Sequence, residues 1–327
     1  MTRIFTEGFE LKDNVFFSTS AGSVSTTYKR SGAASWLVNN NTAKKTIDSA
    51  SEIFIRFGFF RSNVNTTYLF KWYKDATELG SIRFSSVNGK INIYTGTGTL
   101  VDVGDLTIVH DTWYLLEAHI IISDTVGVIE IRIDGVADAT FSGDTKPGAD
   151  TVINTLGYST TQDVYYDDLA YNDTAGAVDN SWCGDGHVIA LTPNANGDLS
   201  QLVGSDTNST DNYLLVDDFP HDEDTTYVEG STVDEKDLYN LTACGLSDVT
   251  IYRVWGESRT KDTVAAGGLV AIVLKTNSTE YPSSDIAVLA SYTKQILGTV
   301  HLVNPNTAVA WSIADLDALQ VGVKTRS

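Results

Sequence analysis

Residues 112–135 carry the pattern that most limits what this chain can fold into. The segment reads TWYLLEAHIIISDTVGVIEIRIDG, and apolar and charged side chains alternate over 129–133. A period of two predicts strands with one face on a core and the other in water. Turn residues separate the two halves at 123–127, and Asp134-Gly135 favours a second tight turn because Gly tolerates positive φ. We therefore expect a β-hairpin that is followed directly by another turn.

Similar patterns recur along the chain and predict an all-β protein. Residues 52–61, EIFIRFGFFR, read as a central strand, and Asn88-Gly89 between two apolar runs is a hairpin signal. The best helical candidate is the short segment 312–320, which Ser312 could cap. Many short strands with regular turn signals and few helices indicate antiparallel sandwiches.

Changes in composition suggest two domains. The chain has 327 residues, enough for two cores of ordinary size. Small and polar residues without periodicity begin at about 172, and a turn-rich stretch runs to 212. We expect a first domain over 1–175, a connector over 176–212 that contains one strand at 186–191, and a smaller β-sandwich domain over 213–327.

Charge and cysteine usage narrow the classes of partner and cofactor. The net charge of −20 argues against nucleic acid, whose phosphates need a basic face, and more weakly against anionic membranes. No apolar run has the length of a signal peptide or a membrane span, so we expect synthesis in the cytoplasm without standard export. Cys183 and Cys244 are expected to be free, although a bridge between them stays open. They form no zinc motif, and we expect no metal and no cofactor.

The order of several short motifs gives the first domain a family resemblance. These motifs are Gly8-Phe9-Glu10, the strand 52–61, Asn88-Gly89, the Trp113-led hairpin that ends in Asp134-Gly135, and the closing Asp167-Asp168-Leu169. Over 1–175 the chain resembles the laminin-G-like, concanavalin A-type lectin/glucanase jelly roll. The resemblance implies two curved, packed sheets, and it leaves the activity open.

The whole chain resembles the two-domain proteins of bacteriophage and prophage structural-gene sets. The segments that carry this resemblance are DDLAYND, GHVIALTPNANGDLSQL, DNYLLVDDFPHDEDTTYV, KDLYNL and WSIADLDALQVGVK. It implies a virion structural protein, either a capsid decoration or minor capsid protein or a tail-associated one. Its expected partners are other virion proteins of the capsid or tail, it is expected to form a homo-oligomer, and its expected location is the virion.

Catalytic motifs are hard to find, and we expect that the chain is not an enzyme. Glucanases of this fold place carboxylates on alternate residues of one strand. The nearest stretch is 130–134, but Arg132 separates Glu130 from Asp134, which itself lies in a turn. Asp167-Asp168 and the acidic run 217–224 could donate oxygens to Ca²⁺, yet turn capping and surface charge explain them more simply.

Carbohydrate binding is the alternative function. Lectin-type sites place an aromatic ring against the apolar face of a sugar, with amide or carboxylate groups beside it. Trp72 and Tyr73, flanked by lysines, form one candidate, and Trp36 near Asn39-Asn40-Asn41 forms another. Core packing explains each of these aromatic residues as well. The alternative is an adsorption module of the tail-fibre or receptor-binding type, with a host surface glycan as its partner.

Overall fold

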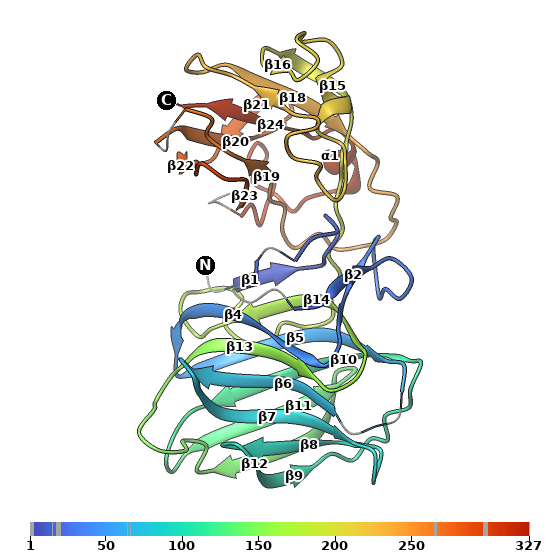
Figure 1. The fold of residues 1–327 in the computed structure, drawn as a ribbon, viewed down its shortest axis with the longest axis vertical. Coiled ribbons are helices and arrows are strands. Elements are labelled where there is room, and N and C mark those ends of the chain that lie inside the picture. The colour runs from blue at the N-terminus through green and yellow to red at the C-terminus, as the bar shows by residue number, and fades with distance from the viewer. Residues whose placement is uncertain are drawn as a thin grey trace. The chain divides into compact units, whose positions relative to one another are not determined.

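The chain forms two compact β units in the computed structural model (Figure 1). The first unit is Met1–Ala190 and the second is Leu191–Ser327. Within the described residues, the only α-helix is α1 (Ile313–Asp317), so the all-β prediction is confirmed. The structure describes residues 3–14, 16–17, 21–63, 65, 67–264, 267–296 and 300–326.

The first unit is a sandwich of two antiparallel sheets that lie face to face (Figure 1). The larger sheet has eight strands, in the order β12 (Val136–Gly143), β11 (Gly127–Ile133), β10 (Trp113–Ile121), β5 (Glu52–Arg61), β14 (Val164–Asn172), β3 (Ser35–Val38) and β2 (Ser23–Ser25), with β1 (Arg3–Glu7) beside β14. The smaller sheet has six strands, in the order β4 (Asn41–Ala50), β13 (Ile153–Thr160), β6 (Thr67–Lys74), β7 (Thr77–Ser85), β8 (Lys90–Thr95) and β9 (Thr99–Val103).

The core lies between these two sheets, and strand alternation builds it. On β5, Ile53, Ile55, Phe57 and Phe59 all point into the core and are fully buried. Their neighbours along the strand face the opposite side of the sheet, as the period of two requires. The predicted jelly-roll sandwich of the first domain is therefore present, built from the strands that the sequence indicated.

The two predicted hairpins form with the expected turns. β10 pairs with β11 in a register that places Glu117 opposite Arg132, and the following turn holds Asp134 at φ 51° and Gly135 at φ 79°. β7 pairs with β8 around Asn88-Gly89, where Gly89 has φ 69°. Both turns use the left-handed region that Gly enters without a steric penalty.

The second unit is smaller and is also built from antiparallel strands. Its main sheet has the order β15 (Pro193–Ser200), β18 (Lys236–Leu241), β24 (Gln320–Thr325), β20 (Leu269–Thr276) and β21 (Thr279–Pro282), with β22 (Ile286–Ala287) beside β20. Two further pairs are β16 (Val203–Gly204) with β17 (Val228–Glu229) and β19 (Glu257–Thr260) with β23 (Thr293–Ile296). A 3₁₀ turn, η1, covers Asn212–Leu215. Ser312 caps helix α1, and its side chain accepts a hydrogen bond from the Asp315 amide, as the sequence suggested.

The segment that follows β14 differs from the prediction. Residues 176–190 belong to the first unit, so the division falls after Ala190 rather than at 175. The strand expected over 186–191 is absent, and that prediction is wrong. Its backbone groups bond to side chains instead of a neighbouring strand. The Val188 amide donates to Asp168 Oδ1 at 2.9 Å, and the Gly184 carbonyl accepts from Arg56 Nη1 at 3.1 Å.

Two further expectations concern the cysteines and membrane-spanning segments. Both cysteines are free, with Cys183 half-buried and Cys244 buried, so no bridge joins them. Burial raises the pKa of the Cys183 thiol to about 11. Among the described residues, no helix combines the length and apolar character needed to cross a bilayer.

Candidate functional site

Two of the three aromatic residues predicted to bind carbohydrate lie in the core. Trp36 and Trp72 are both fully buried, so neither ring can stack on a sugar. Trp36 packs on Phe17 with the ring centroids 4.3 Å apart. Trp72 lies opposite Gly80 across the strand pair, and a Cβ at Gly80 would come within 2.2 Å of the indole ring. The glycine makes room for the large ring inside the sandwich, which corrects the prediction for these residues.

Tyr73 lies near a surface where side chains of several strands meet. Alternation along β6 turns Tyr73 to the side of the strand opposite Trp72, outside the core cluster that contains Trp72. Tyr73 is only 6% exposed because Lys44 of β4 covers it, with Nζ 4.3 Å from the ring centroid. Burial, and next the carboxylate of Glu78, raise the pKa of Tyr73 well above its usual value, so its hydroxyl stays protonated.

The outer face of the six-stranded sheet carries a row of cations held against tyrosine rings. Lys71 Nζ lies 3.8 Å from the ring centroid of Tyr68. The guanidinium of Arg83 lies between two rings, 4.4 Å from the centroid of Tyr68 and 3.9 Å from that of Tyr94. Each such contact contributes about 0.5–1 kcal/mol at an exposed site and more when desolvated. The rings therefore fix the positions of two cationic groups on this face.

Polar partners on β7 complete the arrangement. Arg83 Nε donates to Ser81 Oγ at 3.0 Å, and its Nη2 donates to the Thr97 carbonyl at 3.0 Å. Glu78 Oε2 accepts from Lys71 Nζ at 2.9 Å, while Glu78 Oε1 lies 3.7 Å from Arg83 Nη2. We call this set the tyrosine–cation face, and its members are Lys44, Tyr68, Lys71, Tyr73, Glu78, Ser81, Arg83, Asn92 and Tyr94.

The charge of the tyrosine–cation face is opposite to that of the whole chain. It combines Lys44, Lys71 and Arg83 with the single carboxylate of Glu78, whereas the chain carries a net charge of −20. A local excess of positive charge on a rigid strand surface attracts carboxylates and other anions. The arrangement can therefore bind an anionic group and place tyrosine hydroxyls around it.

Only part of this face could have been found in the sequence. Tyr73 was predicted because it adjoins Trp72 and two lysines. Ser81, Arg83, Asn92 and Tyr94 were missed, although they occupy alternate positions on either side of the Asn88-Gly89 turn. Alternate polar residues are also what an ordinary solvated face shows, so the pattern alone did not distinguish a site.

The carboxylates that were considered as Ca²⁺ ligands, although no metal was expected, bond to protein groups. Asp168 is fully buried, and it accepts from Arg30 Nη1 at 2.8 Å and lies 3.0 Å from His187 Nδ1. Burial and the neighbouring Asp168 raise the pKa of Asp167 to about 8. In the acidic run 217–224, two carboxylates pair with Arg259 and Lys261. The part of the chain that the structure describes contains no cluster of three metal-ligating side chains.

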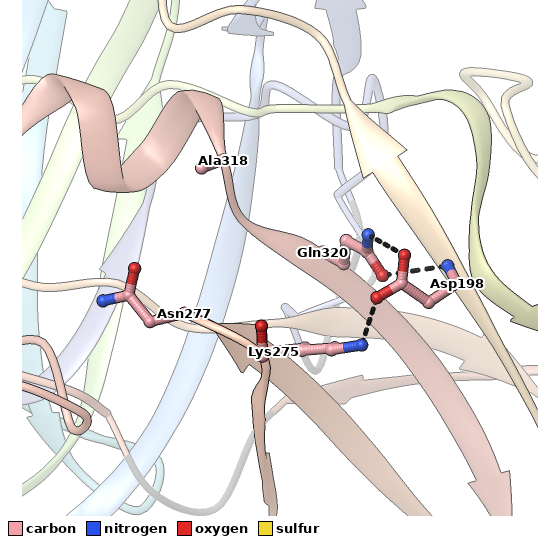
Figure 2. Close-up of a pocket in the computed structure, with 6 residues that line it drawn as sticks. Asp198, Lys275, Asn277, Ala318 and Gln320 are labelled. Atoms are coloured by element: carbon pink, nitrogen blue, oxygen red, sulfur yellow. Dashed lines mark hydrogen bonds and ion pairs between the residues drawn. The ribbon is translucent and has the colours of Figure 1, made fainter.

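Two other polar regions are less suited to binding a charged ligand than the tyrosine–cation face. A hollow of about 190 Å³ in the second unit is lined by Asp198, Lys275, Asn277, Ser278, Ala318 and Gln320 (Figure 2). Asp198 already forms an ion pair with Lys275 and two hydrogen bonds with Gln320 at 3.1 Å, so the hollow presents no free charge. In the first unit, Arg132 pairs with Glu130 at 3.0 Å on the outer face of the eight-stranded sheet, as expected for a solvated face.

The chain is distantly similar in structure to several known proteins. No family model and no curated protein matches it. An endo-β-1,4-glucuronan lyase from the fungus Trichoderma reesei is 14% identical, with 56% of this chain and 100% of that chain covered and a TM-score of 0.40. An alginate lyase from Chlorella virus is 10% identical, with coverage of 46% and 89% and a TM-score of 0.35. A Bacillus subtilis protein described as having a galectin-like fold is 11% identical, with coverage of 53% and 96% and a TM-score of 0.38.

These findings correct the expectation that the chain is not an enzyme. Several of the similar structures are polysaccharide lyases, so a sandwich of this kind gives no ground for excluding catalysis. The expectation rested on the missing pair of alternate carboxylates, which belongs to glycoside hydrolysis only. Elimination breaks a polysaccharide without such a pair. At these identities and TM-scores, the likeness itself assigns no activity to this chain.

Proposed function

We propose that the tyrosine–cation face of the first unit binds an anionic polysaccharide that contains uronic acid. The observation that carries the proposal is the pair of cations, Lys71 and Arg83, held over tyrosine rings on neighbouring strands. A guanidinium matches a carboxylate through two parallel hydrogen bonds, and an ammonium adds a point charge beside it. Strands fix both groups more firmly than loops would, which favours a repeated, extended ligand.

The geometry favours an acidic ligand over a neutral one. A neutral sugar needs the open face of an aromatic ring, but the cations already cover faces of Tyr68, Tyr73 and Tyr94. The cationic heads are what this face offers to a partner. Binding should therefore weaken as salt rises, because the Debye length falls from about 10 Å at 0.1 M to about 3 Å at 1 M.

Eliminative cleavage by the same face is the second candidate function. The hydroxyls of Tyr68 and Tyr94 make no hydrogen bond to any described residue, so they are available to a ligand beside the cations. In the elimination, a base removes the proton at C5 of the uronate and the C4–O bond breaks. Its electron pair leaves with the departing oxygen, which takes up a proton, while a C4–C5 double bond forms. Cations at the carboxylate stabilise the charge that develops, and a tyrosine hydroxyl can transfer protons.

Calorimetry with the full chain tests the binding proposal. Polyglucuronate and alginate are titrated against a neutral glucan of similar length at low and high salt. Arg83→Gln is expected to weaken polyuronate binding on the order of tenfold or more, since it removes a charged hydrogen-bonding group. Arg132→Gln, on the outer face of the other sheet, is the matched control and should leave the affinity unchanged. Equal affinity for the neutral glucan, or no binding to either polyuronate, would overturn the proposal.

The same samples test cleavage. Incubation with polyuronate is followed by the ultraviolet absorbance of the unsaturated product and by mass spectrometry of the fragments. A rise in absorbance that Arg83→Gln abolishes supports elimination. Binding without any unsaturated product would overturn the proposal of eliminative cleavage, and the binding proposal would stand.

We also propose, from the sequence resemblance alone, that the protein is a component of a virion, where it would contact capsid or tail proteins. On a virion the tyrosine–cation face would serve adsorption to an acidic glycan of the host surface. Electron microscopy of purified particles labelled with an antibody against this chain is expected to show it on the capsid or the tail. Particles that carry no label, from cells that produce the protein, would contradict this placement.

A further inference from the structure

Two hydrogen-bond acceptors on the tyrosine–cation face are enclosed and have no donor. They are Glu78 Oε1 and Asn92 Oδ1, and neither accepts a hydrogen bond from any described residue. Leaving a buried acceptor unsatisfied costs about 1–3 kcal/mol, more if it is charged. Native proteins keep such groups mainly where a ligand or a water molecule completes them.

Both acceptors belong to residues that neighbour Arg83. Asn92 of β8 is the register partner of Arg83 on β7, and it is 5% exposed. Its neighbours Ile91 and Ile93 point into the core, so strand alternation places Asn92 on the outer face. On β7 itself, Glu78 holds Lys71 through Oε2 at 2.9 Å, which leaves Oε1 3.7 Å from Arg83 Nη2.

The chemistry of these atoms limits what can satisfy them. Both oxygens only accept, so the carboxylate of a uronate cannot bond to either of them. A sugar hydroxyl can donate, and a uronate ring carries hydroxyls beside the carboxylate that Arg83 would hold. One ring could therefore satisfy the cation and both acceptors together.

We propose, on the basis of the proposed function, that Glu78 Oε1 and Asn92 Oδ1 accept hydrogen bonds from ring hydroxyls of the uronate bound at Arg83. The pair selects uronates whose hydroxyls are unsubstituted. O-Acetylation replaces the donor with an ester that can only accept, which leaves the two oxygens unpaired against a bulky group. Sites built to bond a substrate hydroxyl reject analogues that lack it far more strongly than apolar pockets reject a missing methylene.

The test compares polyglucuronate with the same polymer after chemical O-acetylation. The affinity of the full chain for each polymer is measured by calorimetry, and the wild-type protein is expected to prefer the unsubstituted polymer by on the order of tenfold or more. Asn92→Leu keeps the size of the side chain and removes the acceptor, so it should reduce this preference severalfold. Asn240→Leu, an exposed asparagine of the second unit, is the matched control and should leave the preference unchanged. Thermal unfolding confirms that each variant is folded.

The outcomes separate this inference from the proposed function. Equal binding of both polymers by the wild-type protein would overturn the inference while the proposed function stands. Binding of neither polymer would overturn both. A preference that Asn92→Leu leaves intact in a folded protein would overturn the role of Asn92, since acetyl groups would then be excluded for another reason. The wild-type comparison needs no variant, so it decides even if Asn92→Leu fails to fold.

Discussion

At the scale of single residues, Glu10 makes a definite prediction about pH. Glu10 is 8% exposed, and burial raises the pKa of its carboxyl to about 7, although the amides of Ala33 and Ala34 act in the opposite direction. In the unfolded chain this group ionises near pH 4.5. The protonated form of Glu10 therefore adds to the free energy of unfolding below about pH 4.5. This contribution, about 3 kcal/mol in total, is lost as the pH rises toward 7.

Glu10→Gln should therefore stabilise the protein at pH 7 and flatten this part of the curve, because the amide stays neutral. Chemical denaturation between pH 4 and pH 8 measures the effect. Glu130→Gln is the control, since Glu130 pairs with Arg132 on a solvated face. A variant whose stability at pH 7 equals that of the wild type, or is lower, would show that burial does not raise the pKa of Glu10.

Single residues also show which parts of the site could be predicted from the sequence and which could not. The pair Trp72-Tyr73 was indicated by composition, but which of the two faces outward depends on the register shift between Tyr68 and Phe70, where Leu69 and Phe70 both point into the core. A slip of one residue exchanges the faces of a strand, and a single sequence does not reveal where the slip occurs. Tyr73 therefore joins the tyrosine–cation face, and Trp72 lies in the core.

At the scale of elements, the Asp134-Gly135 turn is where sequence and structure agree most closely. Gly135 has φ 79° and no atom within 4 Å of its added Cβ, so only backbone strain opposes a side chain there. Gly135→Ala is expected to lower the free energy of unfolding by about 1 kcal/mol. Gly98→Ala is the control, since Gly98 has equal space without a positive φ, and it should be neutral or slightly stabilising. Denaturant titration that gives the two variants equal stabilities would contradict the assignment of strain to this turn.

Strands and hairpins were predictable because they depend on neighbours in the sequence. The segment after β14 was not, because its structure depends on distant side chains. Residues 186–191 look like a strand by composition, yet their backbone groups bond to Arg30 and Asp168. Arg30 lies 156 positions from Gly186 and Asp168 lies 20 positions from Val188, and bonds to such side chains leave no periodic signal in the sequence.

At the scale of the whole molecule, the boundary between the units leads to a prediction about fragments. Residues 181–188 lie on the first unit, where the Gly184 amide donates to Glu117 at 2.7 Å and the Gly184 carbonyl accepts from Arg56. Both Glu117 and Arg56 are almost fully buried. A chain that ends at 175 removes these partners, and it also removes the imidazole of His187 and the Val188 amide from Asp168.

The fragment 1–190 should therefore fold with a cooperative transition, and the fragment 1–175 should be less stable by about 3 kcal/mol or more, because buried charges lose their partners. Urea denaturation followed by tryptophan fluorescence measures both. The comparison is informative because 1–175 keeps every strand of the sandwich, so its apolar core is unchanged. Equal midpoints for the two fragments would mean that water replaces the lost bonds, and the boundary expected from composition would then be the correct one.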